Sequence, residues 1–208
     1  MNRKGIVGLI IVLLVFGSYA VPKILNRLNP EQLVFIGKAP AFSLPNQNGK
    51  LIANNAFEGK VYLVSFFFST CPTICPIMNA NMYKVQHEFL GNPNFGIASI
   101  SINPKNDTPA VLKEYAKKIG VTSKSWYFLT GDQKTIYSLA NKGFALYATE
   151  NNAVAGGFEH SGMFALIDKK GNIRSRKDAH GNPIAFYDGL DNKSIRALKR
   201  DIQLLLQE

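Results

Sequence analysis

Two cysteines separated by three residues are the part of this sequence best suited to chemistry. Cys71 and Cys75 stand in the stretch Cys-Pro-Thr-Ile-Cys-Pro, and the 208 residues contain no other cysteine. Pro76 has no N–H to donate, so it belongs in the first turn of a helix, which we predict over residues 77–89. Backbone N–H groups and the helix dipole at such a turn favour thiolate over thiol.

This spacing is compatible with a disulfide and with two sulfurs on one metal ion. On a tight turn, cysteines four positions apart bring their Cα atoms to roughly 5–6 Å. A stapling disulfide would close so small a loop that it would add little stability, which favours a redox-active pair or a metal site. Soft sulfur ligands suit Cu(I), Zn²⁺ or iron–sulfur chemistry, and two cysteines are too few for a cysteine-only zinc or iron–sulfur site.

The elements that position this pair are predicted from hydrophobic patterning. Residues 61–68 and 95–102 are continuous apolar runs, typical of strands buried on both faces. We predict further strands and helices as follows: a helix over 111–119 ending at Gly120, a strand over 126–129, a helix over 132–140, a hairpin of 163–167 and 173–177, and a helix over 194–206. Parallel strands joined by helices and followed by a hairpin predict an α/β fold in three layers.

The composition is that of a folded, basic protein. There are 24 basic and 14 acidic residues, a formal charge of +10, and 46% of the residues are hydrophobic. The basic residues are scattered, and no groove-reading or base-stacking motif accompanies them, so we expect no nucleic-acid partner. A basic surface that faces an acidic protein or lipid headgroups is the simpler interpretation.

The N-terminus is expected to be a membrane segment. The basic residues Arg3 and Lys4 precede an uncharged run of 17 residues, 5–21. As a helix this run covers roughly 26 Å, just enough to span a thin bilayer core. We predict a transmembrane signal-anchor over 1–22, a linker over 23–38 and a folded domain over 39–208. The alternative is a signal peptide that is cleaved after Ala20.

Several motifs in the domain together resemble the Sco/SenC family. Members of that family carry a Cys-Pro-x-x-Cys-Pro turn, here Cys71 to Pro76, and a distant His-Ser before a late strand, here His160 and Ser161. Residues 101–109, Ser-Ile-Asn-Pro-Lys-Asn-Asp-Thr-Pro, resemble the family's strand-to-helix junction. Residues 42–50 resemble the opening hairpin of thioredoxin-like proteins.

The resemblance implies a thioredoxin-like fold and one copper ion held by Cys71, Cys75 and His160. It also implies that the protein delivers copper to the dinuclear copper site of cytochrome c oxidase, or reduces the cysteines of that site. The expected partners are the copper-site subunit of the oxidase and a periplasmic copper donor or thiol reductant. The expected location is the inner membrane, with the domain on the periplasmic side.

The sequence departs from the family pattern at three positions. Thr73 stands where an acidic residue is common, Asn103 where Asp is common, and Glu159 where Asp precedes the histidine. None of the three removes an implied ligand.

Other candidate residues receive simpler interpretations. His160 has the alternative of being an ordinary loop histidine. His87 is expected to be solvated within its helix, and His180 is assigned no role.

Core packing is expected for the two methionines of the same helix, Met78 and Met82, although Met78 is near enough in sequence to be a weak auxiliary ligand. Asp107 is expected to cap the helix that follows it.

The alternative function is a membrane-anchored thiol–disulfide oxidoreductase. In that reaction Cys71 is the attacking thiolate and Cys75 resolves the mixed disulfide. Against it, three residues separate the cysteines instead of the two of Cys-x-x-Cys oxidoreductases.

Overall fold

The computed structural model describes residues 13–14, 16–21 and 32–208. The chain divides into two compact units, Met1–Gln32 and Leu33–Glu208. In the first unit residues 13–14 and 16–21 are helical. Of the helices formed by described residues, none has the length and apolar character needed to cross a membrane. The predicted anchor over 1–22 falls mostly on residues outside this description and stays a prediction.

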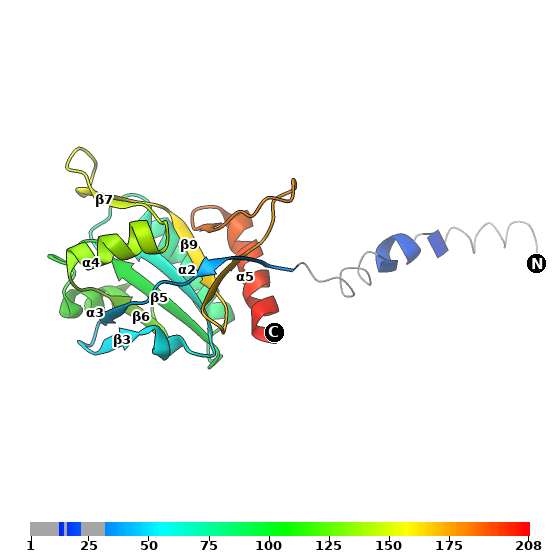
Figure 1. Ribbon diagram of the computed structural model, residues 1–208, viewed down its shortest axis with the longest axis horizontal. Helices are drawn as coiled ribbons and strands as arrows, with labels where there is room; N and C mark the ends of the chain where they lie inside the picture. The colour runs from blue at the N-terminus through cyan, green and yellow to red at the C-terminus, as the bar shows by residue number, and fades with distance from the viewer. Residues whose placement is uncertain (1–12, 15, 22–31) are drawn as a thin grey trace, which may run out of the picture. The chain divides into compact units, whose positions relative to one another are not determined.

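The second unit is built on a seven-stranded mixed sheet (Figure 1). Its strands run in the order β1 (Val34–Lys38), β10 (Asn172–Ser175), β9 (Met163–Ile167), β4 (Val61–Phe67), β5 (Phe95–Ser101) and β6 (Trp126–Leu129), and β11 (Tyr187–Asp188) also pairs with β9. Strands β4, β5 and β6 are parallel. Strand β9 runs antiparallel to β4, and β10 and β1 continue the antiparallel pairing.

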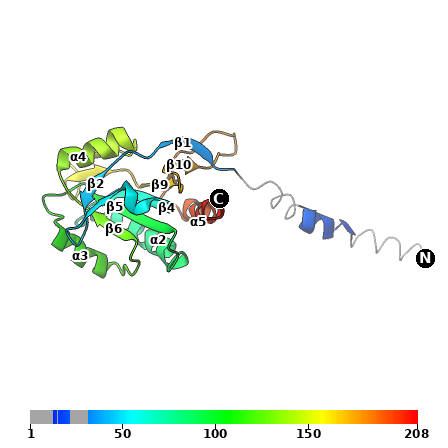
Figure 2. The same cartoon turned by 60° about the horizontal axis from the view of Figure 1, so that its bottom comes forward.

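Helices cover both faces of this sheet. One face carries α2 (Cys75–Glu88), α3 (Pro109–Lys118) and α5 (Asn192–Gln207), and the other carries α4 (Gln133–Ser138) (Figure 2). Asn79 on α2 donates to the Tyr115 hydroxyl on α3 at 2.5 Å, and Lys199 on α5 pairs with Glu88 on α2 at 2.7 Å. The predicted three-layer α/β arrangement is therefore confirmed.

Two small hairpins complete the domain. Strands β2 (Ser43–Pro45) and β3 (Leu51–Ala53) form one, followed by a 3-10 turn at Asn54–Phe57, and β7 (Ala148–Glu150) and β8 (Phe158–His160) form the other. Gln47, between β2 and β3, accepts from the backbone N–H of Phe128 at 2.9 Å and donates to the Trp126 carbonyl at 3.2 Å. These bonds occupy the backbone groups of the edge strand β6, which would otherwise be free to pair with another chain.

Strands β4 and β5 form the centre of the core. All seven residues of each strand are buried, because each has a neighbour on both sides and helices cover both faces. The buried hydroxyls of Ser65 and Ser99 lie 3.2 Å apart, and Trp126 Nε1 donates to Ser99 at 3.0 Å. The polar groups inside this apolar layer therefore have partners, as burial requires.

The structure corrects two predicted boundaries. The folded unit begins at Leu33 and not at residue 39, because residues 34–38 form the edge strand β1 paired with β10. The helix predicted over 132–140 ends as α4 at Ser138 and continues as a wider π turn over Leu139–Gly143. The strands predicted over 61–68, 95–102 and 126–129 are confirmed to within one residue.

Removing β1 should destabilise the domain. Leu33 is buried, and the Arg174 guanidinium donates to its carbonyl at 2.9 and 3.3 Å. A chain that begins at residue 39 loses this burial and the pairing of β1 with β10, at a cost of about 3 kcal/mol. We expect a thermal midpoint roughly 10 °C lower than that of a chain beginning at residue 32, measured by circular dichroism. Equal midpoints would show that β1 contributes nothing to stability.

Candidate metal centre

The sheet topology brings three loops together at one end of the central strands. Because β4 and β5 are parallel, both end on the same side of the sheet. The loop after Phe67, which carries the cysteines, and the loop after Ser101 therefore begin next to each other. Because β9 is antiparallel to β4, the first residue of β9, Met163, lies beside the end of β4. His160 precedes Met163 by three positions. Residues 71, 75 and 160 are therefore neighbours in space although they are distant in sequence.

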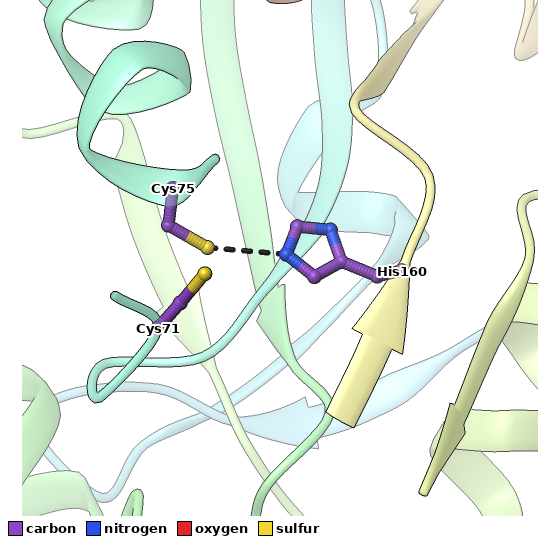
Figure 3. A group of neighbouring side chains, drawn as sticks. All are labelled: Cys71, Cys75 and His160. Atoms are coloured by element: carbon purple, nitrogen blue, oxygen red, sulfur yellow. Dashed lines mark hydrogen bonds between the residues drawn. The ribbon is translucent and has the colours of Figure 1, made fainter. Parts of the chain in front are cut away.

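Three donor atoms converge at this end of the strands. The sulfurs of Cys71 and Cys75 and a ring nitrogen of His160 all lie within 4.8 Å of one another. Cys75 Sγ is 3.1 Å from His160 Nε2, and Figure 3 shows both sulfurs and Nε2 turned toward one another. Both cysteines are buried free thiols, and His160 is partly buried.

This arrangement fits a single soft metal ion. Donors bonded at about 2.0–2.3 Å to a common ion stand at most about 4.6 Å apart, so only a small adjustment would be needed here. Two sulfurs and one imidazole suit copper or zinc better than hard cations. Among the described residues, the histidine, cysteine and acidic side chains supply no fourth ligand close to these three.

The imidazole of His160 is fixed in the orientation that metal binding needs. Its Nδ1 lies 3.0 Å from the Ser161 carbonyl, which only accepts, so Nδ1 carries the proton and the Nε2 lone pair faces the sulfurs. The ring meets that of Phe68 edge-on, with the centroids 5.9 Å apart. Gly156, at the tip of the β7–β8 hairpin, has a φ of 91°, and a Cβ there would stand 3.0 Å from Phe68 and Pro72. The hairpin therefore packs directly on the cysteine loop.

The two thiols differ in charge. The pKa of Cys71 is held well below its ordinary value, chiefly because Cys75 hydrogen-bonds to its thiolate. The pKa of Cys75 is raised, first by that same bond and second by burial. The pair therefore shares one proton, with Cys71 as the anion and Cys75 as the neutral thiol. A metal ion held by both sulfurs must displace this proton.

Asp107 anchors the cysteine loop to the sheet. Its fully buried carboxylate accepts from the backbone N–H of Ser69 at 2.9 Å, from the hydroxyls of Ser69 and Ser101, and from the amide of Asn106 at 2.8 Å. The prediction that Asp107 caps the next helix is wrong, because Thr108 supplies the cap. The Asp107 carboxylate instead joins the loop after β4 to the end of β5.

A second link joins the cysteine helix to the histidine strand. Asn81 on α2 is buried and donates to the Gly189 carbonyl at 2.8 Å. Gly189 in turn donates its N–H to the Gly162 carbonyl at 2.8 Å, two residues after His160. These two hydrogen bonds, which involve three residues, thus link the helix that begins at Cys75 to the segment that carries His160.

The other predicted candidates lie away from the donor cluster or in the core. His87 and His180 are exposed, and Met78 and Met82 are buried, as expected. The sequence analysis did not identify Phe68, Asn81 or the buried role of Asp107. A polar residue at the end of a predicted strand, as Ser69 and Ser101 are, is the only signal in the sequence that points to such an anchor.

Comparison with known proteins identifies the family of this chain. The family model described as SCO1/SenC matches residues 36–193, which is more than half of the chain. The chain belongs to the SCO1/SenC family. The SCO1 protein homolog of Bacillus subtilis (strain 168) is 33% identical over 166 residues, which are 76% of this chain and 82% of the homolog.

Solved structures of the family share the fold. BsSco, described as a member of the Sco family of cytochrome c oxidase assembly proteins with a disulfide switch, matches with a TM-score of 0.68 and 26% identity, over 85% of this chain and 97% of BsSco. Bradyrhizobium japonicum ScoI with copper bound matches with a TM-score of 0.64 and 23% identity, over 81% of this chain and 99% of ScoI. The SCO1/SenC fold of this chain is therefore thioredoxin-like, as the sequence predicts.

Replacing Asp107 should loosen the cysteine loop. Asp107→Ala leaves the Ser69 N–H and the Ser101 hydroxyl without their buried acceptor, and we expect a loss of about 3 kcal/mol in the free energy of unfolding in urea. The control, Asp132→Ala, removes an exposed cap of α4 and should cost clearly less. Equal losses would mean that Asp107 does no more than a cap.

The two cysteines should differ in reactivity. Cys71 is the anionic sulfur and lines a surface hollow, whereas Cys75 is 1% exposed and its sulfur contacts His160. With limiting iodoacetamide at pH 7, we expect Cys71 of the reduced protein to be alkylated about tenfold faster than Cys75. Peptide mapping by mass spectrometry measures the ratio. Equal modification of both residues would contradict the assignment of the charge to Cys71.

Proposed function

We propose that this protein binds one copper ion through Cys71, Cys75 and His160 and carries it during the assembly of cytochrome c oxidase. The observation that carries the proposal is the convergence of two sulfurs and one imidazole nitrogen within 4.8 Å. Copper is here the cargo, and the residues of the site are the means of holding and releasing it.

The chemistry of the donors supports copper as the cargo. Thiolates and a neutral imidazole are soft or borderline ligands, and a set of three suits Cu(I), which accepts low coordination numbers. Structural zinc sites take four ligands, and the described histidine, cysteine and acidic residues supply three. The copper-bound ScoI shares the fold, and BsSco, described as belonging to a family of oxidase assembly proteins, is 26% identical to this chain.

The burial of the site supports a carrier over a structural centre. A surface hollow of about 220 Å³ is lined by Cys71 and His160, together with Thr73 and Glu159, while Cys75 lies behind them. Two of the three donors are therefore reached from solvent at one side. An incoming thiolate can replace them in turn, which is how a carrier releases a soft ion without unfolding.

Delivery is the finer part of the proposal. We propose that the copper goes to the dinuclear copper site of the oxidase, and that the carrier receives it from a periplasmic donor. The predicted signal-anchor over residues 1–22 would hold the domain at the outer side of the inner membrane, where that site is assembled. These assignments rest on the sequence pattern and on the family.

A thiol–disulfide oxidoreductase is the second candidate, favoured by the asymmetry of the cysteines. Cys71 is anionic and lines the surface, and Cys75 is the buried neighbour that would resolve a mixed disulfide. The Cys71 thiolate would attack one sulfur of a target disulfide, and the Cys75 thiolate would then displace the target. Two electrons pass to the target, which leaves as a dithiol, and a Cys71–Cys75 disulfide remains.

Removing the imidazole should separate these functions. In the reduced full chain, kept in mild detergent because of its apolar N-terminal run, we expect one Cu(I) per protein in a titration against a competing chelator. His160→Ala removes one of three ligands and should lower the affinity at least about a hundredfold. The control, His87→Ala, removes an exposed histidine outside the site and should leave the affinity unchanged.

The alternative makes the opposite prediction. If the parent and His160→Ala proteins bind Cu(I) equally well and both reduce a model disulfide efficiently, the carrier proposal fails and the oxidoreductase remains.

A further inference from the structure

A second hollow is lined by Cys71 and not by His160. It is a groove of about 770 Å³ between α2 and α3. We call it the α2–α3 groove and define it by its lining residues: Ser69, Cys71, Pro76, Asn79, Ala80, Tyr83, Lys84, Tyr115, Lys118, Ile119 and Gly120. Apart from Cys71, none of these residues belongs to the donor cluster.

The walls of the α2–α3 groove are preformed. Tyr115 stacks on the buried Phe67, with the centroids 5.5 Å apart, and receives the bond from Asn79. Tyr83 is 42% exposed and lies against Gly120, where a Cβ would be 3.1 Å from its ring. Gly120 has a φ of 79°, so a side chain is excluded there by conformation as well as by contact. The groove thus presents two aromatic rings that a ligand can cover without rearrangement.

The charge of the groove is positive. Its described lining contains Lys84 and Lys118, no aspartate or glutamate, and one sulfur that can carry negative charge, that of Cys71. Lys84 lines the groove with its side chain, and its Nζ bonds to Asn81 at 2.8 Å and to Asn192, the first residue of α5, at 3.3 Å. Both partners are neutral amides, so these contacts leave the positive charge of Lys84 uncancelled. The whole chain carries a formal charge of +10. A ligand with negative charge is therefore favoured both at the groove and during its approach.

Cys71 connects this groove to the donor cluster. It is the one residue common to the α2–α3 groove and the hollow beside His160. A chain lying along the groove passes Cys71, which lines it, and does not pass His160, which lines only the other hollow. A thiol carried by that chain would meet Cys71 first.

We propose that the α2–α3 groove docks an extended, acidic segment of a partner protein and places a cysteine of that segment beside Cys71. The inference rests on the proposed function, for which it names the surface that receives the partner. Tyrosine rings and amide groups supply contacts for a polypeptide, and the two lysines select acidic residues that flank its cysteine. The docking itself is non-covalent.

A labelled peptide tests the docking. The probe is a short fluorescein-labelled peptide with a central serine in place of the cysteine, flanked on both sides by Asp, Glu and Leu. Its matched partner carries Lys at the acidic positions. By fluorescence anisotropy with the reduced full chain in detergent, we expect the acidic peptide to bind at least about tenfold more tightly, with the difference shrinking as salt is added.

Paired variants locate the binding site. Lys84→Glu with Lys118→Glu reverses the groove charge and should weaken binding of the acidic peptide at least about tenfold. Lys113→Glu with Lys124→Glu changes the net charge equally at exposed positions outside the groove and should leave the affinity within about twofold. Tyr83→Ala, which removes an exposed ring and no charge, should also weaken binding.

A second measurement reports whether the segment lies beside Cys71. The acidic peptide, now with its cysteine joined to an aromatic thiol as a mixed disulfide, is added to the Cys75→Ser protein. The Cys71 thiolate attacks the peptide sulfur and releases the aromatic thiolate, whose absorbance gives the rate. We expect the groove charge reversal to slow this exchange about tenfold, and the control reversal to leave it unchanged.

The outcomes separate this inference from the proposed function. If the groove and control variants bind the peptide alike, or the basic peptide binds as well as the acidic one, the docking proposal is overturned. Cu(I) titration of the same charge variants should still give one ion per chain. Loss of copper binding in the parent protein would instead overturn the carrier, whatever the peptide does.

Discussion

The pairing of β4 with a parallel strand on one side and an antiparallel strand on the other is the constraint on which the site depends. This pairing places the end of β4, the end of β5 and the beginning of β9 next to one another, on one side of the sheet. The cysteine loop, Asp107 and His160 are supplied by the segments at those three ends.

The buried Asp107 places negative charge close to the two sulfurs. The buried Asp107 carboxylate, satisfied by donors from Ser69, Ser101 and Asn106, contributes to raising the pKa of the nearby Cys75 thiol. Two negative sulfurs beside a buried carboxylate repel one another, and a cation relieves that repulsion. The same arrangement therefore holds the loop in place and favours a positive ion over an empty pair of thiolates.

Sequence patterns predicted the parts of the fold that repeat a local rule. The runs at 61–68 and 95–102 were recognisable because strands buried on both faces have no polar alternation, and Pro76 marked the start of a helix. Strands of two or three residues, such as β7, β8 and β11, are too short to show a period. Asp107 was misassigned because Asp-Thr-Pro also fits a helix start, and its partner Ser69 is 38 positions away. His160 was placed by family resemblance, since a lone loop histidine carries no pattern.

The hairpin that carries His160 has a consequence for how the domain moves. Strands β7 and β8 have three residues each and pair only with each other. A two-stranded ribbon of this size is marginal by itself, so it depends on its packing against Phe68 and Pro72. Local unfolding of the ribbon requires far less free energy than unfolding of the seven-stranded sheet. The imidazole therefore belongs to the least cooperative part of the site, whereas the sulfurs belong to a loop and helix start that Asp107 links to the central sheet.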